Sequence, residues 1–330
     1  MMATNPLSAE RAFALDYTAE ADRIAARLRE ALTKDLNRRG LVVAISGGID
    51  SSVSAALAVR AVGPKRVYGL LLPERVSSPQ STHRGRLLAT HLGIEHEVFD
   101  IAPALEALGC YARIDEVCKA VHPGYGAGWK NKIVLEGGLQ GRYNHFKLVA
   151  QDPAGALHEA RLEYRQYLQI VAATNFKQRV RKTMEYYHAD RLNYAVVGTP
   201  NRLEYDQGFF VKNGDGSADV KPIAHLYKSQ VYAMARFMKL PEEICNAIPT
   251  TDTYSLAQGQ DEFYFGLPYA QMDLALWAYE HGESTATLGA ALGISTEAAA
   301  AVYADIEAKR RATRYLGGAP ILMGDPPGRA

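Results

Sequence analysis

The stretch LVVAISGGIDSS, residues 41–52, is the part of the sequence around which the rest of the chain is organised. Its first five residues, 41–45, are apolar and rich in β-branched side chains, which is typical of a strand buried on both faces. A glycine turn at 46–48 ends that run, and residues 50–52 open an alanine-rich segment that predicts a helix. Glycine supplies the conformations that a tight turn needs, and the unpaired N–H groups and dipole of a helix N-terminus favour phosphate. The stretch therefore predicts an anion site.

Two common phosphate loops differ from this one. No lysine follows the glycines, as a P-loop requires, and the dinucleotide pattern GxGxxG is absent. The remaining pattern, SGGxDS, resembles the pyrophosphate loop of the ATP pyrophosphatases. That resemblance implies cleavage of ATP between its α and β phosphates, with transfer of AMP to a substrate oxygen. The alternative is an ordinary glycine turn capped by Ser and Asp.

Composition limits the classes of protein to which the chain can belong. At 330 residues with 48% hydrophobic content, it can form one large domain or two small ones around a substantial core. The formal net charge of +1 gives no general electrostatic case for nucleic acid or a membrane surface. The three cysteines, Cys110, Cys118 and Cys245, lack CxxC spacing, so we expect neither zinc nor disulfides. No signal sequence or membrane-length apolar run is visible, and we expect a soluble cytoplasmic protein.

Strands and helices alternate on both sides of the loop. We predict strands at 41–45, 66–72, 95–101 and 192–197, and helices at 17–38, 53–62, 78–92, 160–187, 223–239 and 267–279. This alternation predicts an α/β fold with a doubly wound parallel sheet, and the resemblance implies its adenine nucleotide alpha hydrolase-like form. Ligands of such sheets lie outside the carboxyl ends of the strands, where the loop falls.

We expect three parts along the chain: an N-terminal helix within 1–39, an ATP pyrophosphatase-like domain at 40–282, and a helical tail at 283–330. Residues 109–158 interrupt the alternation with a glycine-rich, aromatic stretch, predicted to be an ordered insertion over the active site without regular elements. A disordered linker is the alternative. The tail resembles two helices around a turn at 293–295. A DNA-reading function would need a phosphate-binding charge that the chain lacks.

Longer motifs resemble those of ammonia-dependent NAD synthetase, from Gly40 to about Asp273. They are SGGIDSS at 46–52, NFKQRVR at 175–181, VVGTPNRLE at 196–204, GFFVKNGDGSADVKPI at 208–223, LYKSQV at 226–231, PTTD at 249–252 and DEFYFGLPYAQMD at 261–273. The resemblance implies two steps. The carboxylate of deamido-NAD attacks ATP and releases pyrophosphate, and ammonia then displaces AMP from the acyl-adenylate. It also implies Mg²⁺, with ATP as co-substrate, and a homodimer.

The resemblance carries roles to individual positions. ATP binding falls on Ser46, Gly47, Gly48, Asp50, Ser51, Thr199, Lys228 and Thr250; substrate binding on Arg179, Arg181, Lys212 and Asp219; metal binding on Asp50 and Glu204; and catalysis on Asp50, Lys228 and Asp219. A carboxylate beside a triphosphate is repulsive unless a cation lies between them, which favours the metal role. The alternative for Asp50 is a helix N-cap. Arg179 and Arg181 point about 200° apart on a helix, so they cannot serve one ligand in the same way.

Two departures from the family pattern bear on the acid substrate. The family's C-terminal His-Lys pair is missing, and the comparable region reads Arg311-Ala-Thr-Arg-Tyr315. The interval between SGGIDSS and NFKQRVR is longer than is usual in the family, and the extra residues are the aromatic insertion. A ligase for another carboxylic acid and a nucleotide-binding module without catalysis therefore stay open. A tRNA-thiolating enzyme would want catalytic cysteines and a basic surface. Because the chain begins Met-Met-Ala, we expect no N-terminal-cysteine glutaminase, and ammonia that is free or comes from a separate glutaminase.

Overall fold

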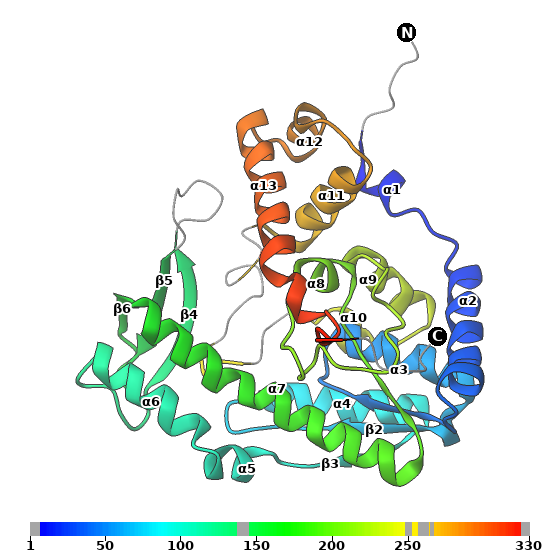
Figure 1. Cartoon of the computed structure of the whole chain (residues 1–330), viewed down its shortest axis with the longest axis horizontal. Coiled ribbons are helices and arrows are strands. Elements are labelled where there is room, and N and C mark those ends of the chain that lie inside the picture. The colour runs from blue at the N-terminus through cyan, green and yellow to red at the C-terminus, as the bar shows by residue number, and fades with distance from the viewer. Residues whose placement is uncertain (1–6, 137–144, 248–252, 257–263, 265–266, 325–330) are drawn as a thin grey trace.

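A computed structural model describes residues 7–136, 145–247, 253–256, 264 and 267–324 (Figure 1). Its centre is a four-stranded sheet of order β3-β2-β1-β7. The strands are β1 (Leu41–Ala44), β2 (Val67–Leu71), β3 (Glu95–Val98) and β7 (Ala195–Val197), and all three pairings are parallel. Each of the four predicted strands is present, although shorter, and the predicted parallel α/β sheet is confirmed.

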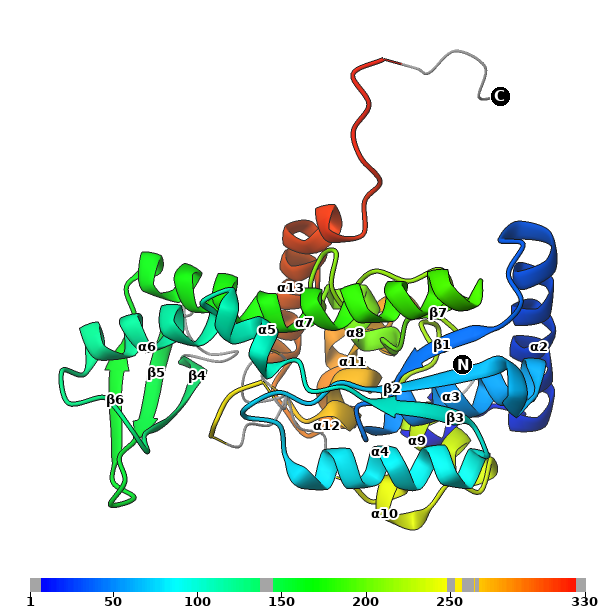
Figure 2. The same ribbon diagram turned by 90° about the horizontal axis from the view of Figure 1, so that it is seen from below.

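Helices cover both faces of this sheet, as Figure 2 shows most clearly. Successive side chains of a strand point to opposite faces. Leu41 and Val43 accordingly join one core cluster, and Val42 joins another. The first cluster includes residues of α2 (Tyr17–Glu30), α3 (Ile49–Val62), α4 (Pro79–Leu92), α9 (Lys228–Phe237) and α10 (Glu242–Cys245). The second includes residues of α5 (Ala102–Ala107), α6 (Cys110–Val121) and α7 (Tyr164–Leu192).

The insertion differs from the prediction, because it contains regular elements. Besides α6 it forms a three-stranded antiparallel sheet from β4 (Lys130–Glu136), β5 (His145–Gln151) and β6 (Leu157–Arg161). Ile133 and Leu148 face each other in register, are fully buried, and join the same core cluster as Val42. The helix predicted from residue 160 begins at Tyr164, because residues 160 and 161 still pair in β6.

The C-terminal region is helical, as predicted. Helices α11 (Tyr269–Glu280), α12 (Thr285–Leu292) and α13 (Thr296–Thr313) share a third core cluster with α1 (Ala9–Ala12) and α8 (Arg202–Gln207). Arg310 of α13 binds Asp206 of α8 at 2.6 Å and Glu280 of α11 at 3.0 Å. Among the described helices, none is by itself long and apolar enough to span a membrane. Residues 285–292 and 296–316 pass that test of length and composition only as a bent pair.

Candidate active site

The SGGxDS loop joins the carboxyl end of β1 to the first turn of α3. Gly47 has a φ of +80°, and a Cβ at this position would overlap the carbonyl oxygen of Ser81, so only glycine fits. Gly48 is the N-cap of α3. The Ser46 N–H donates to Oγ of Ser51 at 3.2 Å, and the Gly48 N–H donates to Oγ of Ser46 at 3.2 Å. The loop therefore has the tight conformation predicted from its glycines.

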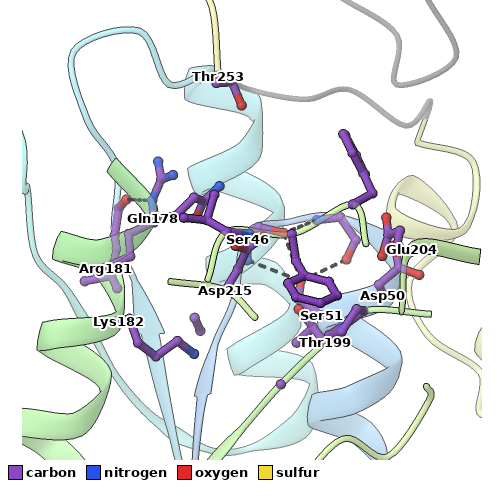
Figure 3. Close-up of a pocket in the computed structure, with 18 of the residues that line it drawn as sticks. Ser46, Asp50, Ser51, Gln178, Arg181, Lys182, Thr199, Glu204, Asp215 and Thr253 are labelled. Carbon is purple, nitrogen blue, oxygen red and sulfur yellow. Dashed lines mark hydrogen bonds between the residues drawn. The ribbon is translucent and has the colours of Figure 1, made fainter. Parts of the chain in front are cut away.

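A cavity of about 830 Å³ opens beside the loop at the carboxyl ends of the strands (Figure 3). A dinucleotide or a nucleoside triphosphate fits a space of this size. The structure brings most of the predicted site residues into its wall: Ser46, Gly48, Asp50, Ser51, Arg179, Arg181, Thr199, Glu204 and Lys212. These residues come from four separate stretches of the chain, at 46–51, 179–181, 199–204 and 212. The fold thus gathers the motifs around one space.

Asp50 and Lys228 form an ion pair beside the loop. Asp50 lies in the first turn of α3, and Lys228, which is 2% exposed, is the first residue of α9. The amide of Asn201 donates to the other carboxylate oxygen of Asp50 at 3.1 Å. Burial opposes the charge on Lys228, but the carboxylates of Asp50 and Glu204 outweigh it and raise the pKa of the ammonium group. Lys228 is therefore a fixed cation paired with Asp50, which lines the cavity.

Glu204 is a second carboxylate that lines the cavity. It is buried on α8, where the Asn201 N–H donates to Glu204 Oε2 at 3.2 Å and the Glu204 N–H donates to Asn201 Oδ1 at 3.1 Å. Burial, and then the charge of Asp50, raise the pKa of Glu204 to about 8. A divalent cation between the two carboxylates would relieve both effects.

The described residues hold no group of three or more His, Cys, Asp or Glu side chains placed for a metal. Asp50 and Glu204 could therefore supply only part of the oxygen shell of a hard cation. Mg²⁺ commonly takes one or two carboxylates and completes its shell with phosphate oxygens and water. The donor set fits Mg²⁺ that arrives with a phosphate ligand.

The two arginines of α7 contact different carbonyl oxygens. Nε of Arg179 donates to the carbonyl of Lys212 at 3.3 Å, and Nε of Arg181 donates to that of Leu72 at 3.1 Å. The Lys212 ammonium donates to the carbonyl of Tyr315 at 2.8 Å, at the end of the C-terminal helical region. The arginines thus extend along two parts of the cavity wall, which agrees with their expected separation.

Gly47 and Lys228 are not lining residues themselves, but they contact Arg84 and Asp50, which are. The last two predicted residues differ from these. Asp219 is not among the described residues that line the cavity; its carboxylate accepts from the N–H of Val196 on β7 at 2.7 Å. In this structure its position supports a role in holding the loop against β7 better than direct contact with the cavity. Thr250 lies outside the described residues.

The same wall contains a buried charged group that was not predicted from the sequence. The Lys182 ammonium donates to Glu185 at 2.6 Å, and both side chains are at least nine-tenths buried. Asp215 lies nearby in the wall, and burial raises the pKa of both carboxyl groups (Figure 3). Charged residues on a helix usually predict a solvated face, which is why they were missed. Residues 182 and 185 follow Gln178 and Arg181 by four positions, which places them on the same helix face, but this spacing does not indicate burial.

Arg84 is a further residue of the site that was not predicted from the sequence. Its Nε donates to the carbonyl of Gly47 at 3.0 Å, and it lines the cavity from α4. The guanidinium is thus a further cation beside the proposed phosphate loop. No local motif marks this position, because its distance from the loop is fixed only by the packing of α4 on the sheet.

Comparisons with known proteins show which family this chain is similar to. A model of the family described as NAD synthase matches residues 20–121 and 143–313. The NH3-dependent NAD+ synthetase of Rhizobium meliloti (strain 1021) is 58% identical over 94% of this chain and 92% of its own length. That of Mesorhizobium japonicum is 55% identical over 94% of this chain and 97% of its own.

Two solved structures have a similar fold. An NMN synthetase from Francisella tularensis has a TM-score of 0.65 at 22% identity, covering 94% of this chain and 99% of its own. An NH3-dependent NAD synthetase from Campylobacter jejuni has a TM-score of 0.62 at 20% identity, covering 94% and 100%. At these identities the likeness is one of fold.

Proposed function

We propose that this chain, which belongs to the NAD synthase family, forms NAD from deamido-NAD, ATP and ammonia with the residues gathered around the SGGxDS loop. The reaction is an AMP-forming carbon–nitrogen ligation. The pyridine carboxylate attacks the α-phosphorus of ATP, pyrophosphate leaves, and ammonia then displaces AMP from the acyl-adenylate. The observation that supports these roles best is that Asp50 and Glu204 both line one large cavity and that the buried Lys228 pairs with Asp50.

Transfer of this kind depends on alignment and on charge neutralisation. In our proposal, backbone N–H groups of the loop and the α3 N-terminus hold the pyrophosphate part of ATP, and Thr199 adds a hydroxyl. Lys228 keeps Asp50 in place and offsets its charge. Mg²⁺, when bound by Asp50 and Glu204, would neutralise the phosphate oxygens and polarise the reacting phosphorus.

The acid substrate is proposed to occupy the part of the cavity that α7 and the C-terminal region line. Arg179, Arg181 and Lys212 supply three cationic groups there, which suit the two phosphates of a dinucleotide. For Asp219 we propose a positioning role: its carboxylate binds the Val196 N–H and so holds the loop that contains Asp219 against β7. Thr250 is kept as an ATP contact on the resemblance alone.

The assembly proposed is a homodimer, with free ammonia or a separate glutaminase as the nitrogen source. Helix α7 supports a dimer, because it exposes Tyr164 at 74%, Leu168 at 44% and Tyr187 at 58%. Apolar side chains along one long helix are a common feature of interfaces between subunits. Light scattering on the purified protein tests this assembly.

Isotope transfer tests the proposed chemistry. Deamido-NAD labelled with ¹⁸O in its pyridine carboxylate should pass one labelled oxygen to the phosphate of AMP. That oxygen bridges the acyl group and AMP in the intermediate, and it leaves with AMP when ammonia attacks the carbonyl carbon. AMP without label, formed alongside NAD, would contradict an acyl-adenylate.

A further inference from the structure

The segment 253–256 begins with two residues that lie between two cavities. Thr253 and Tyr254 line the reaction cavity, and both also line a second cavity of about 350 Å³. Side chains of the insertion, among them Trp129, line that second cavity. A segment with open space on each side has fewer packing contacts to hold it than a core segment has. Its position must depend on individual hydrogen bonds and on the anchoring of single side chains.

The insertion supplies the first set of bonds. The Asn131 N–H on β4 donates to Oγ of Ser255 at 2.7 Å, and the Leu256 N–H donates to the carbonyl of Asn131 at 3.0 Å. Strand β4 is an edge of its sheet, so its outward backbone groups are available for a partner. Residues 255 and 256 are the partner of these groups. The second sheet of the molecule is thereby tied to the wall of the reaction cavity.

A buried ion pair supplies the second set. The Lys177 ammonium of α7 donates to the carbonyl of Thr253 at 2.7 Å and to Glu74 at 2.8 Å. Tyr111 of α6 donates to the other oxygen of Glu74 at 2.8 Å. The side chains of Lys177 and Glu74 are 4% and 0% exposed. Burying two charges is costly, which suggests that this pair has a specific role. The ammonium group binds the carbonyl of Thr253, so we infer that the role is to hold this residue.

The side chain of Tyr254 is the third anchor. It is buried in the core cluster that contains Ile133 and Leu148 of the insertion and Ile170 of α7. Ala247 and Thr253 both line the reaction cavity, as do residues of the SGGxDS loop. Figure 3 shows Thr253 at one rim of this pocket. The place where 253–256 is held therefore sets the part of the cavity wall that Thr253 and Tyr254 form.

We propose that the insertion and the Glu74–Lys177 pair form a clamp on residues 253–256 that positions this wall for ATP. Lys177 and Ser255 are positioning residues and make no contact with the reacting atoms. The insertion then has a role inside its own subunit: it completes the nucleotide side of the cavity. This inference rests on the proposed function only for the identity of the nucleotide.

The test compares two variants that each lose one hydroxyl. Ser255→Ala removes the bond from the Asn131 N–H, and Ser284→Ala removes a matched bond from the Thr287 N–H at 3.0 Å, at the remote N-cap of α12. Binding of ATP with Mg²⁺ is measured by calorimetry on the full chain. We expect Ser255→Ala to weaken ATP binding about fivefold, as the loss of one neutral hydrogen bond implies, with Ser284→Ala unchanged. Ser255→Thr, which keeps the hydroxyl, should restore affinity.

A second variant tests the ion pair without leaving a buried charge alone. Glu74→Gln combined with Lys177→Gln replaces both charges by amides of similar size. We expect it to weaken ATP binding about tenfold or more, because the carbonyl of Thr253 loses a charge-assisted bond. The Michaelis constant for ATP should rise in parallel, while that for ammonium stays the same.

The outcomes separate this proposal from the proposed function. Equal ATP affinity in wild type, Ser255→Ala and the double variant, with all three folded by circular dichroism, would overturn the clamp. So would an equal loss in Ser255→Ala and Ser284→Ala. Wild-type protein that binds ATP and makes no NAD would instead refute the proposed function, and ATP affinity would still decide on the clamp.

Discussion

At the scale of single residues, the two glycines of the loop face different surroundings. Gly47 has a φ of +80°, and a Cβ there would overlap backbone; at Gly48, φ is −89° and a Cβ would meet only Oγ of Ser46, at 3.3 Å. We expect Gly47→Ala to weaken ATP binding at least about tenfold, because the loop must shift. Gly48→Ala, as the matched control, should change it much less. Calorimetry with ATP and Mg²⁺ checks both, and equal losses would contradict the loop geometry.

Residues of the site differed in how well the sequence predicted them. The SGGxDS loop and Glu204 were predictable, because they follow strand ends that meet at one edge of a parallel sheet. Lys182 and Glu185 were not, because local pattern cannot distinguish a buried ion pair on a helix from a solvated one. Asp219 shows that a motif can also suggest a contact that the structure does not contain. Its motif suggested contact with substrate, while its carboxylate binds the backbone of β7.

At the scale of elements, Asp273 joins α11 to the start of α9. Its carboxylate accepts from the N–H and from Oγ of Ser229, both at 2.8 Å, next to Lys228. Burial raises the pKa of Asp273 to about 6 from its ordinary 3.8. Between these values the folded protein binds more protons than the unfolded chain, so this group lowers stability as pH rises through that window.

Asp273→Asn should remove this contribution. The free energy of unfolding of the variant, relative to wild type, should rise by about 3 kcal/mol between about pH 4 and pH 7, since each pKa unit corresponds to about 1.4 kcal/mol. Urea unfolding at several pH values measures it. A difference that is constant with pH would contradict the raised pKa.

Sequence pattern predicted the elements of the parallel sheet because they repeat apolar strand, turn and helix. It failed for the insertion, where the strands β4, β5 and β6 lie among glycines and scattered aromatic residues. Their pairing is antiparallel, and its register depends on contacts such as Ile133 with Leu148. Such contacts across the chain are invisible to a local pattern.

At the scale of the whole molecule, the insertion shares a core with the parallel sheet. Leu148 is fully buried in the cluster that contains Val42 and Leu70. We expect Leu148→Ala to destabilise the protein by about 2–5 kcal/mol and to lower the midpoint of a single unfolding transition. Calorimetry checks this. A separate transition at low temperature, with the main one unchanged, would mean that the insertion folds independently.

The measurement that tests the account most directly is pyrophosphate release from ATP with Mg²⁺ at saturating ammonium, with and without deamido-NAD. We predict release only with deamido-NAD, in equal amount to the NAD formed. Asp50→Asn should reduce it about a hundredfold or more, because an amide cannot offset the metal charge; Asp22→Asn, at an exposed pair with Arg60, should not reduce it. No release with deamido-NAD, from protein that binds ATP, would contradict the account and direct the search to another carboxylic acid.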